Sequence, residues 1–106
     1  TKLGWNQNPT GWWYCTDVQN GYFYENCWKL IDGQWFSFNG DGYAKSNQWE
    51  KYKEKWYYLR ADCSMALSEW LWIDNECYCF NKDGVMYENC ITPDGYKVDE
   101  TGAWIH

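Results

Sequence analysis

Residues 28–49 read WKLIDGQWFSFNGDGYAKSNQW, and the spacing of the tryptophans in this stretch continues along the chain. Trp28 and Trp49 are 21 residues apart, Trp70 follows after another 21, and the next step of 21 reaches an isoleucine, whereas Trp5 precedes Trp28 by 23. A fixed period of about 20 residues is typical of a protein built from stacked structural repeats. The sequence therefore predicts a repeat architecture.

Each repeat has an internal order that predicts a β-hairpin. A second tryptophan follows the first by seven residues in two repeats, at Trp35 and Trp56, and by eight in the first repeat, at Trp13. Between the two tryptophans of one repeat lies Asp32-Gly33, and glycine supplies the positive φ that tight hairpin turns require. A lone hairpin of this size is marginally stable in water, so we expect each hairpin to stack its aromatic side chains on the next.

A second turn is expected after each hairpin, where Gly or Asn again provides the positive φ. These turns lie at Asn20-Gly21, Asp41-Gly42, Asp62-Cys63 and Asp83-Gly84. Two residues past the turn are Met65 and Met86 in the later repeats, replaced by Phe23 and Ala44 in the earlier ones.

From this order we expect a single all-β repeat module over residues 1–106, a solenoid of stacked β-hairpins of about 20–21 residues each. The predicted units are residues 4–26, 27–47, 48–68 and 69–89. We expect residues 90–106 to form a C-terminal cap, because the terminal repeat of a solenoid is usually atypical.

Composition limits the function classes. Aromatic residues make up 23% of the chain, with ten Trp and ten Tyr, so amphipathic rings supply most of the apolar surface and favour ligand-facing surfaces over a deep core. The net charge of −6, with nine scattered Lys and Arg, disfavours nucleic acid. No apolar run is long enough for a membrane span, and the first residues lack the features of a signal peptide. We therefore expect a segment cut from a longer protein.

The residues needed for catalysis are missing from the pattern. The single histidine is the terminal His106, which excludes most Ser-His and Cys-His mechanisms and any multi-His metal site. Carboxylates such as Glu50 and Glu54 lie near aromatic residues, as in glycosidases, but a shallow repeat surface offers no cleft that raises a carboxylate pKa. We expect a non-catalytic chain without a cofactor or metal.

The cysteines leave two interpretations open. Six are present, at positions 15, 27, 63, 77, 79 and 90, and they allow 15 full pairings in a secreted protein. They fit buried free thiols that act as small hydrophobic side chains, and they fit one or more disulfides. Cys77 and Cys79 form a CxC and not the paired CxxC of a structural zinc site.

Taken in order along the chain, the repeated tryptophans, turns and Met positions resemble the choline-binding or cell-wall-binding repeats of Gram-positive surface proteins and phage lysins. The resemblance covers essentially the whole chain. The segments that carry it are Gly4-Trp5, residues 10–14, residues 28–36, residues 55–59 and residues 83–86. It implies a left-handed β-solenoid in which two or three aromatic rings and a Met hold choline between neighbouring hairpins. A quaternary ammonium donates no hydrogen bond, so ring faces recognise it through cation–π contacts of about 0.5–2 kcal/mol each.

Carried over by position, the resemblance places the most complete cage at Trp49, Trp56, Trp70 and Met65. All four matching positions are filled there, and beyond Trp70 the series fails because Cys77 replaces the next ring. The rings are also expected to serve packing between hairpins.

Two further cages are less complete. One uses Trp28, Trp35 and Trp49, with Ala44 in the Met position. The other uses Trp5, Trp13 and Trp28, with Phe23 in that position and one extra residue between its first two rings. We expect one to three working sites.

The function expected from the resemblance is that of a secreted cell-wall anchor, or of the binding part of a phage lysin, that holds choline or phosphocholine of teichoic and lipoteichoic acids. The rival hypothesis is carbohydrate binding, because flat aromatic surfaces also stack on sugar rings. A ligand-free spacer or a homodimerisation element is the third hypothesis.

Overall fold

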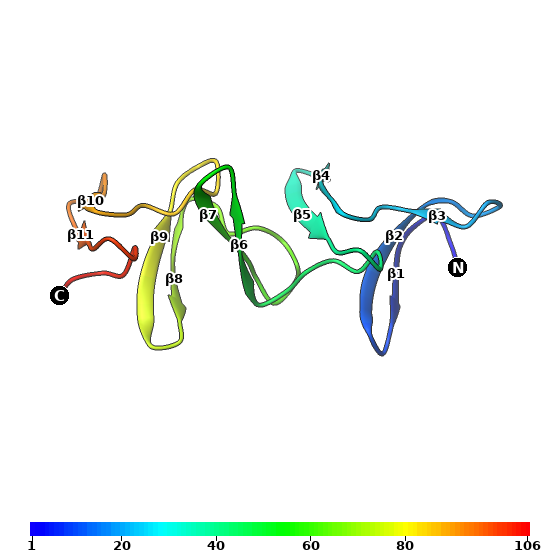
Figure 1. Cartoon of the computed structure of the whole chain (residues 1–106), viewed down its shortest axis with the longest axis horizontal. Coiled ribbons are helices and arrows are strands. Elements are labelled where there is room, and N and C mark those ends of the chain that lie inside the picture. Colours follow the sequence, from blue (N-terminus) through cyan, green and yellow to red (C-terminus); the bar gives the residue numbers. More distant parts are fainter. The chain divides into compact units, whose positions relative to one another are not determined.

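The computed structural model describes residues 1–106, and every regular element in it is a β-strand (Figure 1). The strands pair as consecutive antiparallel neighbours, which gives one three-stranded sheet, β1-β2-β3, and four two-stranded ones. The predicted all-β array of hairpins is therefore confirmed. The strands are β1 (Gly4–Asn8), β2 (Gly11–Asp17), β3 (Tyr22–Phe23), β4 (Cys27–Ile31), β5 (Gln34–Phe38), β6 (Gln48–Tyr52), β7 (Lys55–Leu59), β8 (Glu69–Ile73), β9 (Glu76–Phe80), β10 (Cys90–Ile91) and β11 (Lys97–Val98).

Two-residue turns set the register of the long hairpins. Asp32-Gly33 joins β4 to β5 with φ of 50° and 80°, and Asp74-Asn75 joins β8 to β9 with φ of 50° and 72°. Two consecutive positive φ values define a type I′ turn, whose twist matches that of the strands it joins. Lys53-Glu54 has the same conformation at the tip between β6 and β7.

The second predicted turn is held by an Asn or Asp side chain just after the hairpin. Asn39 Oδ1 accepts backbone N–H bonds from Asp41 and Tyr43, and Asn81 Oδ1 accepts the same pair from Asp83 and Val85. Such side-chain turns replace backbone hydrogen bonds that a bare loop would lose. They fix the direction in which the chain returns to the preceding hairpin.

The chain divides into two compact units, each with its own core. Unit 1 comprises residues 1–48 and 59–64, and unit 2 comprises residues 49–58 and 65–106. The unit 1 core contains Ile31, Phe36, Phe38, Ala44 and Cys63, with Trp5, Tyr14, Tyr24 and Cys27 packed against it. The unit 2 core contains Ala66, Ile73, Phe80 and Met86, with Trp49, Trp56, Tyr58, Leu71 and Tyr78 packed against it.

Within each unit, a large side chain in one loop packs against a glycine in the next loop. A Cβ on Gly84 would lie 2.4 Å from the Met65 methyl carbon, and a Cβ on Gly102 would lie 2.4 Å from Met86 Sδ. Where the large residue is replaced by Ala44, the glycine position is taken by Cys63, which keeps the positive φ of 74° and points its Sγ at the Ala44 carbonyl, 3.8 Å away. The two positions therefore share a fixed volume, as close packing requires.

The six cysteines are free thiols, and four of them, Cys15, Cys63, Cys77 and Cys79, are buried. In this structure these four cysteines therefore act as small core side chains, which is the first of the two interpretations left open by the sequence. The chain forms no helix with the length and hydrophobicity that a membrane span requires.

Candidate functional site

The larger of two aromatic pockets built on the same hairpin geometry lies in unit 2 and has a volume of about 430 Å³. We call it the Trp49 pocket; it is lined by Trp49, Trp56, Tyr78, Met86, Glu100 and Thr101. The Trp49 and Trp56 rings stand at 86° to each other with centroids 6.1 Å apart, and Tyr78 meets Trp49 at 78° and 4.9 Å. Steeply inclined rings form a corner and not a flat platform.

Strand geometry explains why two tryptophans of one hairpin meet. In the hairpin β1–β2, Trp5 lies opposite Tyr14, and Gln7 lies opposite Trp12. Because side chains alternate between the two faces of a strand, Trp5 and Trp12 share one face and are diagonal neighbours. Their centroids are 6.3 Å apart at 85°, which matches the arrangement of Trp49 and Trp56.

The next hairpin and the loop after it supply the remaining walls. Phe80 forms a β-bridge with Met86, which places the thioether beside Tyr78 of the same strand β9. The Met86 N–H donates a 3.0 Å hydrogen bond to the Trp56 carbonyl, so the loop is fixed to the strand that carries one tryptophan wall. Met86 is only 6% exposed, and its sulfur rests on Gly102. The pocket is therefore held in shape without a ligand.

The electrostatics of the Trp49 pocket suit a positively charged ligand. Burial raises the pKa of the Tyr78 hydroxyl, and the carboxylates of Glu76, Asp99 and Asp74 raise it further, so this ring stays neutral at physiological pH. Glu100 places an exposed carboxylate at the rim. Neutral ring faces and one nearby carboxylate attract a cation.

The second pocket lies in unit 1 and has the same arrangement of aromatic walls, but its volume is smaller and its rim carboxylate is held by neighbouring residues. We call it the Trp5 pocket; it has a volume of about 310 Å³ and is lined by Trp5, Trp12, Phe36, Asp62 and Cys63. Phe36 meets Trp5 at 4.8 Å and takes the position of Tyr78. The N–H of Ala44 donates to the Trp12 carbonyl at 2.8 Å, as Met86 does to Trp56.

The rim carboxylate of the Trp5 pocket is already engaged by its own loop. Asp62 Oδ1 accepts hydrogen bonds from the Ser64 hydroxyl at 2.6 Å and the Ser64 N–H at 3.0 Å, and Arg60 lies 4.0 Å away. The Ser64 hydroxyl bond is the main cause that lowers the pKa of Asp62. This carboxylate is ionised but partly neutralised by neighbours.

The structure brings some of the predicted site residues together and separates others. Trp49 and Trp56 form two walls of one pocket, and Trp5 is a wall of the other. Trp13 lies on the opposite face of β2, opposite Asn6, with its ring against Tyr43. Its neighbour Trp12 takes the position in the Trp5 pocket.

Met65 and Trp70 lie outside the Trp49 pocket. Met65 is 3% exposed and packs on Gly84, and Trp70 donates its Nε1–H to Asp94 at 2.8 Å. Trp28 is half-buried opposite Ser37, and Trp35 is exposed opposite Leu30, in the hairpin β4–β5.

Among the rings and the thioether that line the two pockets, sequence reasoning did not assign Trp12, Phe36, Tyr78 and Met86 to a site. For Trp12 the signal was available, because it follows Trp5 by seven residues, as Trp56 follows Trp49. Tyr78 and Met86 come from the second strand of the next hairpin and from its following loop, and their placement depends on long-range packing.

Comparisons with known proteins bear on the family and the fold of the chain. Residues 71–104 match the model of the choline-binding repeat family. The choline-binding domain of Spr1274 from Streptococcus pneumoniae is 32% identical with a TM-score of 0.69, over 74% of this chain and 93% of that one. A comparison with curated protein sequences finds no match.

Two longer proteins share the same structure in part. The cell-wall endolysin from phage Cp-1, solved in complex with choline, is 35% identical with a TM-score of 0.73, over 84% of this chain and 26% of the endolysin. Choline-binding protein F from Streptococcus pneumoniae is 25% identical with a TM-score of 0.82, over 99% of this chain and 34% of that protein. The chain thus spans about a quarter to a third of these two proteins.

Proposed function

This chain belongs to the family of choline-binding repeat modules, and on that premise we propose that it holds the trimethylammonium group of choline in the Trp49 pocket and, more weakly, in the Trp5 pocket. The observation that carries the proposal is the steep inclination of the rings, 86° between Trp49 and Trp56 and 78° between Trp49 and Tyr78. A compact, rounded cation fits between such walls.

The energetics favour a methylated ammonium over a primary one. A trimethylammonium group has no N–H to satisfy, so it loses little when the rings replace its water shell. Three ring contacts of about 0.5–2 kcal/mol each sum to about 1.5–6 kcal/mol, a range that includes the roughly 4 kcal/mol of a millimolar Kd. The Met86 thioether adds polarizable packing on the fourth side.

A flat sugar ring is the less favoured ligand of the Trp49 pocket. Sugars stack on a planar aromatic platform that is flanked by polar side chains, whereas Trp49 and Trp56 meet edge to face. This geometry is the reason to prefer choline over carbohydrate at this site.

We infer a cell-wall anchoring role from the ligand and from the relatives. Choline attached to teichoic or lipoteichoic acid would place its trimethylammonium group in the pocket and leave its phosphate outside. The chain would then act as one module over residues 1–106 that fixes a larger secreted or phage-encoded protein to the cell wall, with any catalysis in another part of that protein.

Choline titration of the chain and two tryptophan variants tests the proposal. Trp56→Ala removes one wall of the Trp49 pocket, and we expect choline affinity at that site to fall about tenfold or more by calorimetry. Trp72→Ala is the matched control, since Trp72 is 63% exposed in the next hairpin and lines neither pocket. Ethanolamine, which lacks the methyl groups, should bind more weakly than choline.

Two results would contradict the assignment. One is a Trp56→Ala variant that binds choline as the parent does. The other is an equal loss of choline affinity in Trp56→Ala and Trp72→Ala.

A further inference from the structure

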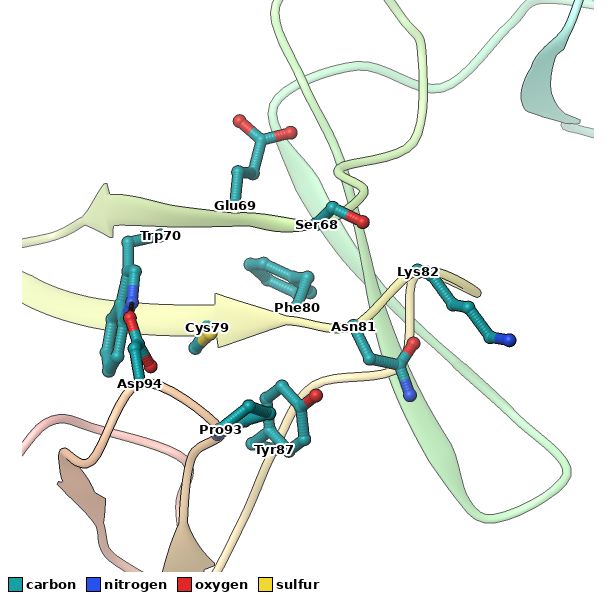
Figure 2. Close-up of a pocket in the computed structure, with 10 residues that line it drawn as sticks. All are labelled: Ser68, Glu69, Trp70, Cys79, Phe80, Asn81, Lys82, Tyr87, Pro93 and Asp94. Atoms are coloured by element: carbon teal, nitrogen blue, oxygen red, sulfur yellow. Dashed lines mark hydrogen bonds between the residues drawn. The ribbon is translucent and has the colours of Figure 1, made fainter.

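A second kind of pocket in unit 2 shares no residue with the Trp49 pocket. It has a volume of about 250 Å³ and lies between the hairpin β8–β9 and the chain that follows it up to Asp94. Figure 2 shows the Trp70 indole on one side, Tyr87 and Pro93 on another, and Asn81 and Lys82 at the far end. Cys79, opposite Trp70 in the strand pair, and Phe80 also line it, and both are buried.

The Trp70 ring is fixed in place before any ligand arrives. Its Nε1–H donates to Asp94 Oδ2 at 2.8 Å, and Asp94 Oδ1 accepts from the Thr92 hydroxyl at 2.5 Å. Tyr96 meets the ring edge to face at 5.9 Å. A ring oriented by these contacts loses little conformational entropy when it stacks on a ligand.

The charges of the lining disfavour both kinds of ion. Lys82 opposes a quaternary ammonium, and because Phe80 is only 1% exposed, Trp70 and Tyr87 are the lining rings that can offer a face to one. Glu69, the second carboxylate of the lining, accepts the Leu67 N–H at 3.1 Å and points away from the other lining side chains in Figure 2. The Asp94 carboxylate opposes an anion such as phosphate. A neutral ligand with many hydroxyl groups remains the class that this lining accepts.

A sugar ring matches the lining through its C–H face and through its hydroxyl-bearing edge. One face of a pyranose presents C–H groups that pack on an indole, and its edge presents hydroxyls that bond to polar side chains. Here the indole of Trp70 is accompanied by an acceptor, Asp94, and by donors on Lys82 and Asn81. The volume is below that of a pocket for a drug-sized ligand and suits one ring.

We propose that the pocket between Trp70, Tyr87 and Asp94 is a subsite for one pyranose ring of a saccharide, separate from the choline pockets. A chain that holds choline and a sugar at once gains avidity for a surface that displays both, even where each affinity is low. The proposal does not depend on choline binding, because the two sites have no residue in common.

The test titrates the 106-residue chain with a tetramer of N-acetylglucosamine and, separately, with maltotetraose. Binding is measured by calorimetry and by the NMR signal of the Trp70 indole N–H. We expect at least one of the two to bind with millimolar affinity and to shift that signal. Trp70→Ala and Lys82→Ala should each weaken the binding, the first by about tenfold or more. Trp56→Ala and saturating choline should leave it unchanged.

Folding of the variants is checked by circular dichroism and urea unfolding, which do not depend on choline binding. If Trp70→Ala does not fold, Trp70→Phe keeps a ring against Tyr96 while it removes the N–H and reduces the stacking area. No binding of either saccharide up to about 20 mM would overturn the proposal. So would binding that choline competes away or that Trp56→Ala abolishes, since the sugar would then occupy the Trp49 pocket.

Discussion

The Trp49 pocket and the Trp5 pocket start from the same hairpin geometry, and they differ in the side chains that close them. The pair Trp5 and Trp12 is separated by 6.3 Å at 85°, and the pair Trp49 and Trp56 by 6.1 Å at 86°. The walls contributed by one hairpin are therefore nearly identical in the two units.

The difference comes from the loops. In unit 2, Met86 lines the pocket and packs on Gly102, and Glu100 is exposed at the rim. In unit 1, the corresponding loop residues are Ala44 and Cys63, and the rim carboxylate of Asp62 is bound by Ser64 and Arg60. One hairpin plan thus gives two pockets with different closing side chains, and we expect the loops to decide which pocket binds choline more tightly.

The largest effect is expected when the cover of the Trp49 pocket is displaced. Gly102→Ala places a Cβ 2.4 Å from Met86 Sδ, so the thioether must leave its position and choline affinity at this pocket should fall about tenfold. Gly95→Ala is the control, because Gly95 has a similar φ of 92° against 87° and nothing within 4 Å of its Cβ. Calorimetry on both variants separates backbone strain from loss of the cover; equal losses would refute the role of Met86.

Two substitutions would give the loops of unit 1 the Met and Gly that the loops of unit 2 carry at the corresponding positions. Ala44→Met alone should lower the free energy of unfolding by about 1–3 kcal/mol, because Cys63 occupies the space that the longer side chain needs. Adding Cys63→Gly restores that space and should recover most of the loss, a coupling that urea unfolding of the two single variants and the double variant measures. Additive effects of the two substitutions would show that the positions do not share volume.

Because the Cys63 thiol lines the Trp5 pocket, we expect its reactivity to report on occupancy of that pocket. Burial and the Asp62 charge raise the pKa of Cys63, so its thiolate is scarce at pH 8 and its alkylation rate should rise about tenfold per pH unit toward the pKa. At pH 9, saturating choline should slow iodoacetamide labelling of Cys63 about threefold or more in mass spectra.

Cys79 is the internal reference for that measurement, since burial is the main cause that raises its pKa to about 11 and it lines neither choline pocket. Equal protection of both thiols would mean that choline acts on the fold as a whole and not on the Trp5 pocket.

The smallest effect is expected from the rim carboxylates. Glu100→Gln should weaken choline binding about two- to fivefold, because an exposed carboxylate near a cation contributes about 0.5–1 kcal/mol, and the effect should shrink at high salt. Asp62→Asn should weaken it less, since the Asp62 charge is already shared with Ser64 and Arg60. A larger effect for Asp62 would reverse the order proposed for the two pockets.

The fold was predictable because local signals in the sequence agree with each other. The period of the tryptophans marks the start of the hairpins, and Asp32-Gly33 and Asp83-Gly84 mark the turns that the structure contains. These features depend on neighbouring residues, so one sequence suffices to find them.

The pockets were predictable only in the part that one hairpin contributes. In β1–β2 a spacing of seven puts two side chains on the same face, whereas the spacing of eight between Trp5 and Trp13 puts them on opposite faces. That alternation could have identified Trp12. The contributions of Tyr78 and Met86 depend on how the next hairpin and loop pack on the first, which no local spacing encodes.

The paired loop positions constrain how such a module can be recombined. Phe23 packs on Gly42, Ala44 on Cys63, Met65 on Gly84 and Met86 on Gly102, so each pair spans the hairpin between its two loops. If a hairpin is transplanted alone into another module, the large residue of a loop pair is separated from the small residue that makes room for it. Units exchanged together with both flanking loops keep their partners, and the viable crossover points therefore lie where no such pair is divided.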